Sequence, residues 1–214
     1  MAPSDLAIVD YGLGNLGSVK NMLKKVGVPS VITGKPDELR AAKALILPGV
    51  GHFDTGMKNL RERGLEAVLR EQVLEKKVPI LGICLGVQLF ARGSEEGVEK
   101  GLGWVAADVK RFTFPQGEAL PVPHMGWNEV EWTDSKLFDG ATKGDARFYF
   151  VHSYHVVPDD PADVAATANY GARFVAAIAH GNVMGAQFHP EKSHRFGLAL
   201  LKNWVSLVGL AHAA

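Results

Sequence analysis

The sequence contains a single cysteine, Cys84, among its 214 residues. One cysteine cannot form a disulfide within the chain, and sparing use of cysteine is typical of proteins in a reducing compartment. A chain of this length can bury a large hydrophobic core, so its folding requires neither disulfides nor a structural metal. We therefore expect a cytoplasmic protein that folds without covalent cross-links.

The sequence also lacks an excess of charge of either sign, with 23 basic and 23 acidic residues. A broad surface for nucleic acid or for an anionic membrane normally shows as a basic excess, so neither partner is expected. The longest uncharged stretch, residues 78–91, is too short to span a bilayer and contains two glycines. Residues 1–11 have no basic patch followed by an apolar run, so no signal peptide is expected.

Clusters of metal-binding residues are missing as well. His152 and His155 are three apart in a predicted strand, where they are expected to point to opposite faces. No group of Cys and His residues has the spacing of a zinc site. The sequence therefore predicts neither a metal nor another cofactor.

The first half of the chain alternates short apolar runs with segments of helical spacing. Strands are predicted at residues 6–10, 30–33, 44–47 and 78–82, and helices at residues 16–26, 36–41 and 60–76. Strands that alternate with helices are typical of βαβ units and of a parallel sheet.

The second half differs, because Gly and Pro interrupt it and its strands follow one another. Strands are predicted at residues 104–112, 128–132, 147–157, 172–179 and 183–188, and a closing helix at residues 193–208. We expect an α/β fold with an open, mostly parallel sheet flanked by helices and an added antiparallel strand layer in the C-terminal half. With no internal repeat or linker, residues 1–214 are expected to form one domain.

Cys84 lies in the segment Gly82-Ile83-Cys84-Leu85-Gly86, between a predicted strand and a helical run. This pattern is typical of a nucleophile elbow, with cysteine in place of serine. At so tight a turn, side chains two positions on either side of the nucleophile would collide, which explains the glycines. Most lone cysteines are small buried hydrophobic residues, but this context favours a nucleophile.

A thiolate enzyme also needs a base and a group that orients it. The predicted strand at residues 183–188 is followed by His189-Pro190-Glu191. Pro190 fixes its own φ and restricts His189, and the Glu191 carboxylate could hold one ring nitrogen while the other faces the thiol. A surface turn that happens to carry a histidine is the alternative, and with eight histidines in the chain spacing alone does not settle the pairing.

A glycine-rich turn, Pro48-Gly49-Val50-Gly51, follows the predicted strand at residues 44–47. Such a turn can point backbone N–H groups into the crevice where open α/β sheets bind ligands. The N–H groups of Val50 and Leu85 could form an oxyanion hole, in which one donor is typically worth roughly 3–4 kcal/mol of transition-state stabilisation. An ordinary turn is the alternative.

Together these motifs resemble the class I (triad) glutamine amidotransferases. The match consists of residues 48–51, residues 82–86 followed by Gln88, and Gln187-Phe188-His189-Pro190-Glu191, in the order found in the family. The resemblance implies that Cys84 attacks the side-chain amide of glutamine. His189 then transfers a proton to the departing ammonia, and water hydrolyses the glutamyl thioester.

Finer features are similar to the branch of this family that serves histidine biosynthesis. They lie at residues 10–16, 123–128, 148–154 and 189–193. This similarity implies a heterodimer in which ammonia passes to a cyclase subunit with a (β/α)₈ barrel. The length of the chain suits a subunit with no fused synthase domain.

The resemblance also implies roles for individual residues. The glutamine substrate would be held by Gly51, Gln88, Glu96, Ser153 and Tyr154, although Glu95 is an equally plausible choice at the third position. Asn15, Tyr149 and Lys192 would face the partner; solvated or structural polar groups are the alternative for these three.

Three competing interpretations remain. Residues 12–17 read G-x-G-x-x-G between a strand and a helix, as in dinucleotide-binding modules. Such modules also carry an acidic residue at the end of the second strand, where this chain has Thr33-Gly34-Lys35. A non-catalytic interaction protein on the same fold is the second alternative, and an amidotransferase that feeds a different synthase is the third.

Overall fold

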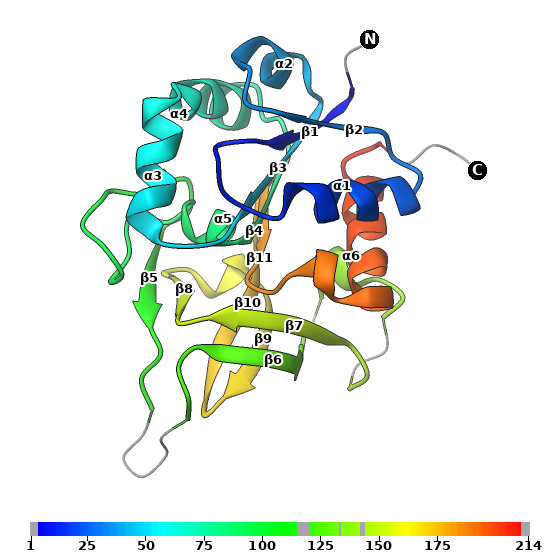
Figure 1. The fold of residues 1–214 in the computed structure, drawn as a ribbon. Coiled ribbons are helices and arrows are strands. Elements are labelled where there is room, and N and C mark those ends of the chain that lie inside the picture. Colours follow the sequence, from blue (N-terminus) through cyan, green and yellow to red (C-terminus); the bar gives the residue numbers. More distant parts are fainter. Residues whose placement is uncertain (1–3, 115–119, 133, 142–143, 211–214) are drawn as a thin grey trace.

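A computed structural model describes residues 4–114, 120–132, 134–141 and 144–210. Its centre is a seven-stranded sheet in the order β2-β1-β3-β4-β11-β10-β9 (Figure 1). The strands of this sheet are β1 (Leu6–Val9), β2 (Ser30–Thr33), β3 (Ala44–Gly49), β4 (Ile80–Cys84), β9 (Val164–Tyr170), β10 (Ala172–His180) and β11 (Val183–Ala186). The pairs from β2 through to β11 are parallel, and β10 pairs antiparallel with both β11 and β9.

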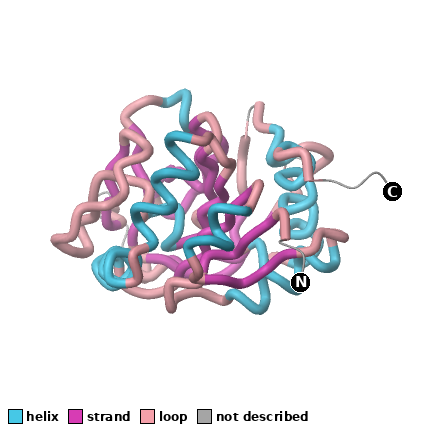
Figure 2. Tube along the Cα trace, turned by 90° about the horizontal axis from the view of Figure 1, so that it is seen from above, coloured by secondary structure: helices cyan, strands magenta, loops and turns pink. Residues whose placement is uncertain are grey.

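Helices lie on both faces of the sheet (Figure 2). They are α1 (Leu16–Lys25), α2 (Pro36–Ala41), α3 (Phe53–Glu62), α4 (Leu65–Arg70), α5 (Leu85–Gln88) and α6 (His194–Leu207). On one face, α1 and α6 bury Leu23, Leu201 and Trp204 against the sheet. On the other face, α3 and α4 bury a second apolar cluster that includes Phe53 and Leu69. The expected α/β fold with a mostly parallel sheet is confirmed.

The antiparallel layer takes the form of two additional small sheets. β5 (Ala107–Arg111) pairs with β8 (Tyr154–Pro158), and β6 (His124–Glu129) pairs with β7 (Arg147–His152). The single strand expected at residues 147–157 is therefore wrong. The chain breaks at Ser153, and the two parts pair with different partners.

The long helix expected at residues 60–76 is also wrong. Gly64 adopts a left-handed conformation, with φ 67°, and separates α3 from α4. The last residues of the segment, Glu71–Glu75, form a π-helical turn. The amphipathic pattern correctly predicts that each piece is helical. It does not reveal that a glycine ends one helix and begins the next.

The parallel sheet determines where a site can lie. The C-terminal ends of β1, β3, β4 and β11 reach the same edge, and Gly49 pairs with Cys84 in the register of β3 and β4. In open α/β sheets, ligands bind in the crevice outside this edge. Within the described ranges, no helix is long and apolar enough to cross a membrane.

Candidate active site

Cys84 occupies a strained turn between β4 and α5. Its φ of 53° and ψ of −110° are unusual for a residue other than glycine. A Cβ on Gly86 would lie 1.8 Å from the Leu47 carbonyl oxygen, and one on Gly82 would lie 2.7 Å from the Val87 Cα. Only glycine fits at these two positions, so the turn has the backbone form of a nucleophile elbow.

His189 follows β11 and is held on several sides. Its Nδ1 lies 2.8 Å from Glu191 Oε1, and both side chains are almost completely buried. The N–H of His189 donates to the Tyr149 carbonyl at 2.9 Å, and its carbonyl accepts from Ser193 Oγ at 2.6 Å. The ring orientation is therefore fixed from both the side chain and the backbone.

The electrostatics favour a protonated His189. Burial alone would lower the pKa of this imidazole, but Cys84 and Glu191 more than compensate, and the pKa rises to about 9. Nε2 is buried and has no hydrogen-bond partner within the described part of the chain. A ring held by a carboxylate on Nδ1 and charged at neutral pH can stabilise a thiolate and deliver a proton from Nε2.

A pocket of about 360 Å³ opens above the cysteine. Its wall contains the predicted residues Val50, Gly51, Cys84, Leu85, Gln88, Glu96, Ser153, Tyr154 and His189, together with Pro123, Val151 and His152. Glu191 does not line the pocket, because it lies behind His189. The structure thus brings segments from β3, β4, β7 and β11 around one cavity.

The two neighbouring glutamates differ in position. Glu96 lines the pocket, and its Oε2 accepts from the backbone N–H of Phe53, the first residue of α3, at 2.8 Å. Glu95 is not in the pocket wall; its Oε2 accepts from the N–H of Arg111 at 2.8 Å. The geometry favours Glu96 over Glu95 as the carboxylate available to a ligand.

Several pocket residues were not assigned a role from the sequence. The Cys84 thiol lies 3.9 Å from the Val151 carbonyl oxygen, and Gln187 Nε2 lies 3.8 Å from Cys84 Sγ. Val151, His152 and Pro123 line the pocket wall, and Gln187 lies beside the wall through its contact with Cys84. All four lie in or beside the matching motifs, and this proximity is the only indication in the sequence that they belong to the site. Their contacts with the pocket form between strands that are distant in the sequence, so local patterns do not predict them.

The residues predicted to face a partner lie near the same edge of the sheet. Lys192 Nζ is 5.5 Å from the centre of the Tyr149 ring, and Asn15 precedes α1, which packs against the turn at Pro190–Lys192. Trp127 is 47% exposed, and its ring contacts those of Tyr149 and His194. No local pattern around Trp127 indicates this exposure.

Two glycines of the G-x-G-x-x-G segment, Gly12 and Gly14, have structural roles, whereas Gly17 has open space around it. A Cβ on Gly12 would lie 2.6 Å from Arg63 Nη2, and one on Gly14 would lie 3.1 Å from the Pro48 carbonyl oxygen. The loop therefore packs closely against α3 and β3. Gly12 and Gly14 also adopt positive φ, 90° and 107°, a backbone conformation that favours glycine, so the turn accounts for both without a dinucleotide.

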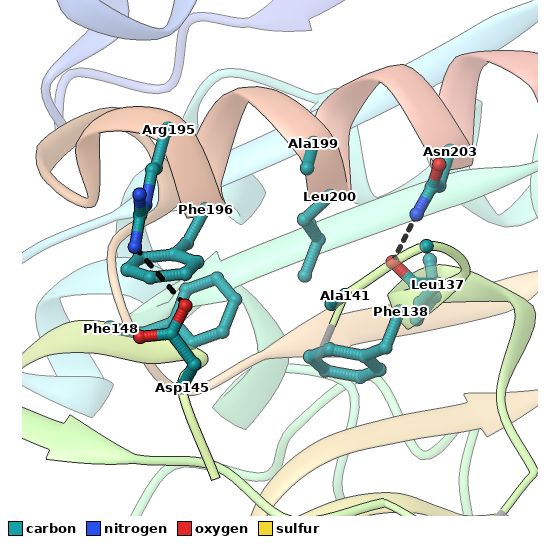
Figure 3. A pocket seen from close by; sticks show the side chains of 11 residues that line it. Leu137, Phe138, Ala141, Asp145, Phe148, Arg195, Phe196, Ala199, Leu200 and Asn203 are labelled. Carbon is teal, nitrogen blue, oxygen red and sulfur yellow. Dashed lines mark hydrogen bonds and ion pairs between the residues drawn. The ribbon is translucent and has the colours of Figure 1, made fainter. Parts of the chain in front are cut away.

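A second hollow, of about 240 Å³, lies between α6 and the segments 137–141 and 145–148 (Figure 3). Apolar side chains line most of it, and its ion pair joins exposed Arg195 and Asp145. It lacks a nucleophile beside a base, so it is a weaker candidate for catalysis than the pocket at Cys84.

The expected orientation of two histidines is wrong. His152 and His155 belong to different strands, and both rings pack against Phe112 and Phe174 rather than pointing to opposite faces. Even so, no three His, Cys, Asp or Glu side chains of the described residues are grouped as metal ligands.

Comparison with known proteins gives consistent results. The family described as "Glutamine amidotransferase class-I" matches residues 7–207. The chain is 50% identical over 204 residues to "Imidazole glycerol phosphate synthase subunit HisH 2" of Pseudomonas aeruginosa, covering 95% of this chain and all of that one. It is 49% identical over 201 residues to "Imidazole glycerol phosphate synthase subunit HisH" of Bdellovibrio bacteriovorus, covering 93% and 98%.

Solved structures share the fold at lower identity. A crystal structure titled as a glutamine amidotransferase superposes with a TM-score of 0.71 at 24% identity, covering 96% of this chain and 99% of that one. A putative GMP synthase subunit from Thermoplasma acidophilum superposes with a TM-score of 0.72 at 20% identity, covering 98% of this chain and 96% of that one. The family match and the relatives of about half identity establish that the chain belongs to the class-I glutamine amidotransferases.

Proposed function

We propose that this chain is the glutaminase subunit of an imidazole glycerol phosphate synthase. It hydrolyses glutamine to glutamate and ammonia and passes the ammonia to a cyclase subunit in histidine biosynthesis. The observation that carries the proposal is Cys84 on a strained elbow, beside a buried His189–Glu191 pair at the wall of one pocket. The relatives of about half identity, named as subunits of this synthase, support the choice among amidotransferases.

The geometry supports a thioester mechanism. The Cys84 thiolate attacks the side-chain carbonyl carbon of glutamine, and a C–S bond forms. His189 gives its Nε2 proton to the amide nitrogen, the C–N bond breaks, and ammonia leaves. Water then attacks the thioester while His189 takes one of its protons, and glutamate departs as the thiolate is restored. Glu191 keeps the imidazole oriented throughout.

Developing negative charge on the substrate oxygen needs donors. We assign this role to the backbone N–H groups of Val50 and Leu85, two residues that line the pocket together with Cys84. Val50 follows β3, Leu85 begins α5, and the pairing of Gly49 with Cys84 keeps the two segments adjacent.

The remaining wall residues would recognise glutamine. The Glu96 carboxylate, which is anchored on the first turn of α3, would pair with the substrate α-ammonium group. Gln88, Gly51, Ser153 and Tyr154 complete the enclosure. No cofactor is required by this chemistry.

The partner would be a cyclase with a (β/α)₈ barrel, in a cytoplasmic heterodimer. Asn15, Tyr149 and Lys192 are proposed to face it, and the exposed side chains of Met125 and Trp127 extend the same surface. We further infer that residues 1–214 act as one glutaminase domain, because the central sheet draws strands from both halves of the chain.

A glutaminase assay with and without the cyclase tests reaction, partner and coupling together. We expect low glutamate release by the chain alone and a rise when the cyclase and its phosphoribulosyl formimino substrate are added. Products should be imidazole glycerol phosphate and aminoimidazole carboxamide ribotide. If glutamate release does not change when this cyclase is added but rises when another synthase is added, the chain would instead be an amidotransferase that feeds that other synthase.

A further inference from the structure

A series of hydrogen-bonded polar side chains, beginning at the partly buried Asn128 and continuing through two buried histidines, runs from β6 to the pocket. Asn128 Nδ2 lies 3.3 Å from His124 Nε2, and His124 Nδ1 lies 3.3 Å from His152 Nε2. His152 Nδ1 in turn lies 2.8 Å from the Tyr154 carbonyl oxygen. His124 is 3% exposed and His152 is 6% exposed, and aromatic rings such as that of Phe174 surround both.

The groups at the two ends of this hydrogen-bonded series fix the direction in which hydrogens are donated along it. Asn128 Oδ1 accepts from the N–H of Glu129 at 2.8 Å, and Nδ2 donates to the Asn169 carbonyl at 2.8 Å, so the amide group presents a donor to His124. At the other end, the Tyr154 carbonyl can only accept. Two neutral rings satisfy every contact in one way: each carries its proton on Nδ1 and accepts on Nε2.

The environment keeps both rings neutral. Burial lowers the pKa of His124 to about 4, and it lowers that of His152 to about 3 despite the hydrogen bond to Tyr154. A neutral His152 also adds no positive charge next to the protonated His189 in the same pocket. The two histidines therefore act through hydrogen bonds rather than through charge.

The series of hydrogen bonds continues into the proposed glutamine pocket. The Tyr154 carbonyl also accepts from Gln88 Nε2 at 2.9 Å, and Gln88 Nε2 donates its second hydrogen to Gln187 Oε1 at 3.1 Å. Gln187 Nε2 points at Cys84 Sγ, 3.8 Å away. With both hydrogens of its amide engaged, Gln88 presents Oε1, an acceptor, to a ligand in the pocket.

We propose that Asn128, His124 and His152 are positioning residues for glutamine hydrolysis, forming a one-directional relay that fixes the Tyr154 carbonyl and, through it, the Gln88 side chain. This inference rests on the proposed glutaminase function and deepens it. The relay selects a ligand with N–H donors facing Gln88 Oε1, as an amide or an α-ammonium group provides. It also supports the Gln187 amide, which donates toward the nucleophilic sulfur.

Histidine tautomers test the relay without any assay of activity. In the folded ¹⁵N-labelled chain, long-range ¹H–¹⁵N correlation spectra distinguish a protonated ring nitrogen from an unprotonated one. We expect both His124 and His152 to be neutral at pH 7, with the proton on Nδ1. An Nε2–H form of either ring would overturn the relay, whatever the enzyme does.

A matched pair of variants tests the positioning role. An asparagine at position 124 places its amide donor near the former Nδ1, so His124→Asn retains donation to His152. His124→Gln places the amide near the former Nε2 and loses that donation. Both variants remove the ring, so thermal unfolding should show similar destabilisation. In the complex with the cyclase, we expect the KM for glutamine of His124→Gln to be about tenfold above that of His124→Asn, with similar kcat, as for one lost buried hydrogen bond.

The outcomes separate the two proposals. An inactive wild-type complex would refute the glutaminase function while leaving the tautomer result in place. An active wild type with equal KM for the two variants would refute the positioning role alone. If either variant fails to fold, Asn128→Leu against Asn128→Gln repeats the comparison at the surface end, and equal KM there would again refute the relay.

Discussion

At the scale of single residues, the strained backbone of Cys84 is the feature most closely linked to chemistry. A non-glycine residue at φ 53° costs free energy that the neighbouring packing must offset. The same conformation projects the thiol from the end of β4 toward the wall that contains His189. The strain is therefore coupled to the exposure of a nucleophile to substrate.

Replacement of Cys84 by alanine should abolish glutamine hydrolysis, because no other group in the pocket can form the thioester. The fold should persist, since the substitution removes one atom from a side chain that is 6% exposed. Glutamate release by the complex measures the first effect, and circular dichroism measures the second. Substantial glutamine-dependent turnover by this variant would contradict the thioester mechanism.

His189 should make stability depend on pH. Its folded pKa of about 9 lies above the unfolded value near 6.5, so the stabilisation is fully present below pH 6.5 and is lost as pH rises through 9. The free energy of unfolding, relative to that of His189→Asn, should fall by up to about 3 kcal/mol over this range. Urea denaturation at pH 6, 7.5 and 9.5 measures the difference.

A Cys84→Ser variant provides the control for this titration. It removes the contribution of the thiol and leaves Glu191 as the only group that raises the pKa of His189. The fall in stability between pH 6.5 and 9 should then be smaller. An unchanged pH profile in the serine variant would show that Cys84 does not interact with the imidazole.

At the scale of elements, the loop between α5 and β5 is held in position by hydrogen bonds to the first turn of α3. The Asp54 carboxylate, in the first turn of α3, accepts from the N–H groups of Val98 at 3.1 Å and Glu99 at 2.9 Å. Glu96 binds the N–H of Phe53 in the same turn. These backbone bonds, that of Glu99 foremost, lower the pKa of Asp54 despite partial desolvation.

Asp54→Asn should therefore weaken glutamine binding without touching the pocket. The amide replaces an anionic acceptor of two backbone donors, at a cost of about 1–2 kcal/mol, and it loosens the loop that carries Glu96. We expect the KM for glutamine to rise several-fold with little change in kcat. Asp37→Asn is the matched control, because Asp37 also lies in the first turn of a helix but is almost fully exposed. Equal KM values for the two variants would contradict this role.

The elements also show which features a sequence can predict. The elbow and its glycines are local, so the segment from Gly82 to Gly86 was sufficient to predict a strand, a tight turn and a helix. The break at Gly64 was missed because an amphipathic pattern continues on both sides of it. The contact of His124 with His152 requires pairing of β6 with β7, and this pairing depends on long-range register rather than on local pattern.

At the scale of the whole molecule, the proposed catalytic residues and the proposed partner-facing residues lie at one edge of the sheet. The strand ends that present Cys84 and His189 also support the segments with Tyr149, Lys192 and Trp127. In contrast, α6 starts near this edge and runs away from it, so its last residues lie farther from β6 and β7 than its first residues do (Figure 1). A partner on the first surface could sense or alter the pocket directly.

Trp127→Glu should weaken the complex with the cyclase by about tenfold or more, because a large exposed aromatic ring is the kind of residue that dominates interfaces. Leu207→Glu is the matched control, since Leu207 is also an exposed apolar residue, 39% accessible, but lies at the end of α6. Titration calorimetry measures both affinities. Glutaminase stimulation by Trp127→Glu should recover at high cyclase concentration, and free ammonia should support the cyclase regardless of the variant. Equal affinities for the two variants would place the partner on another surface and leave the glutaminase chemistry of the pocket intact.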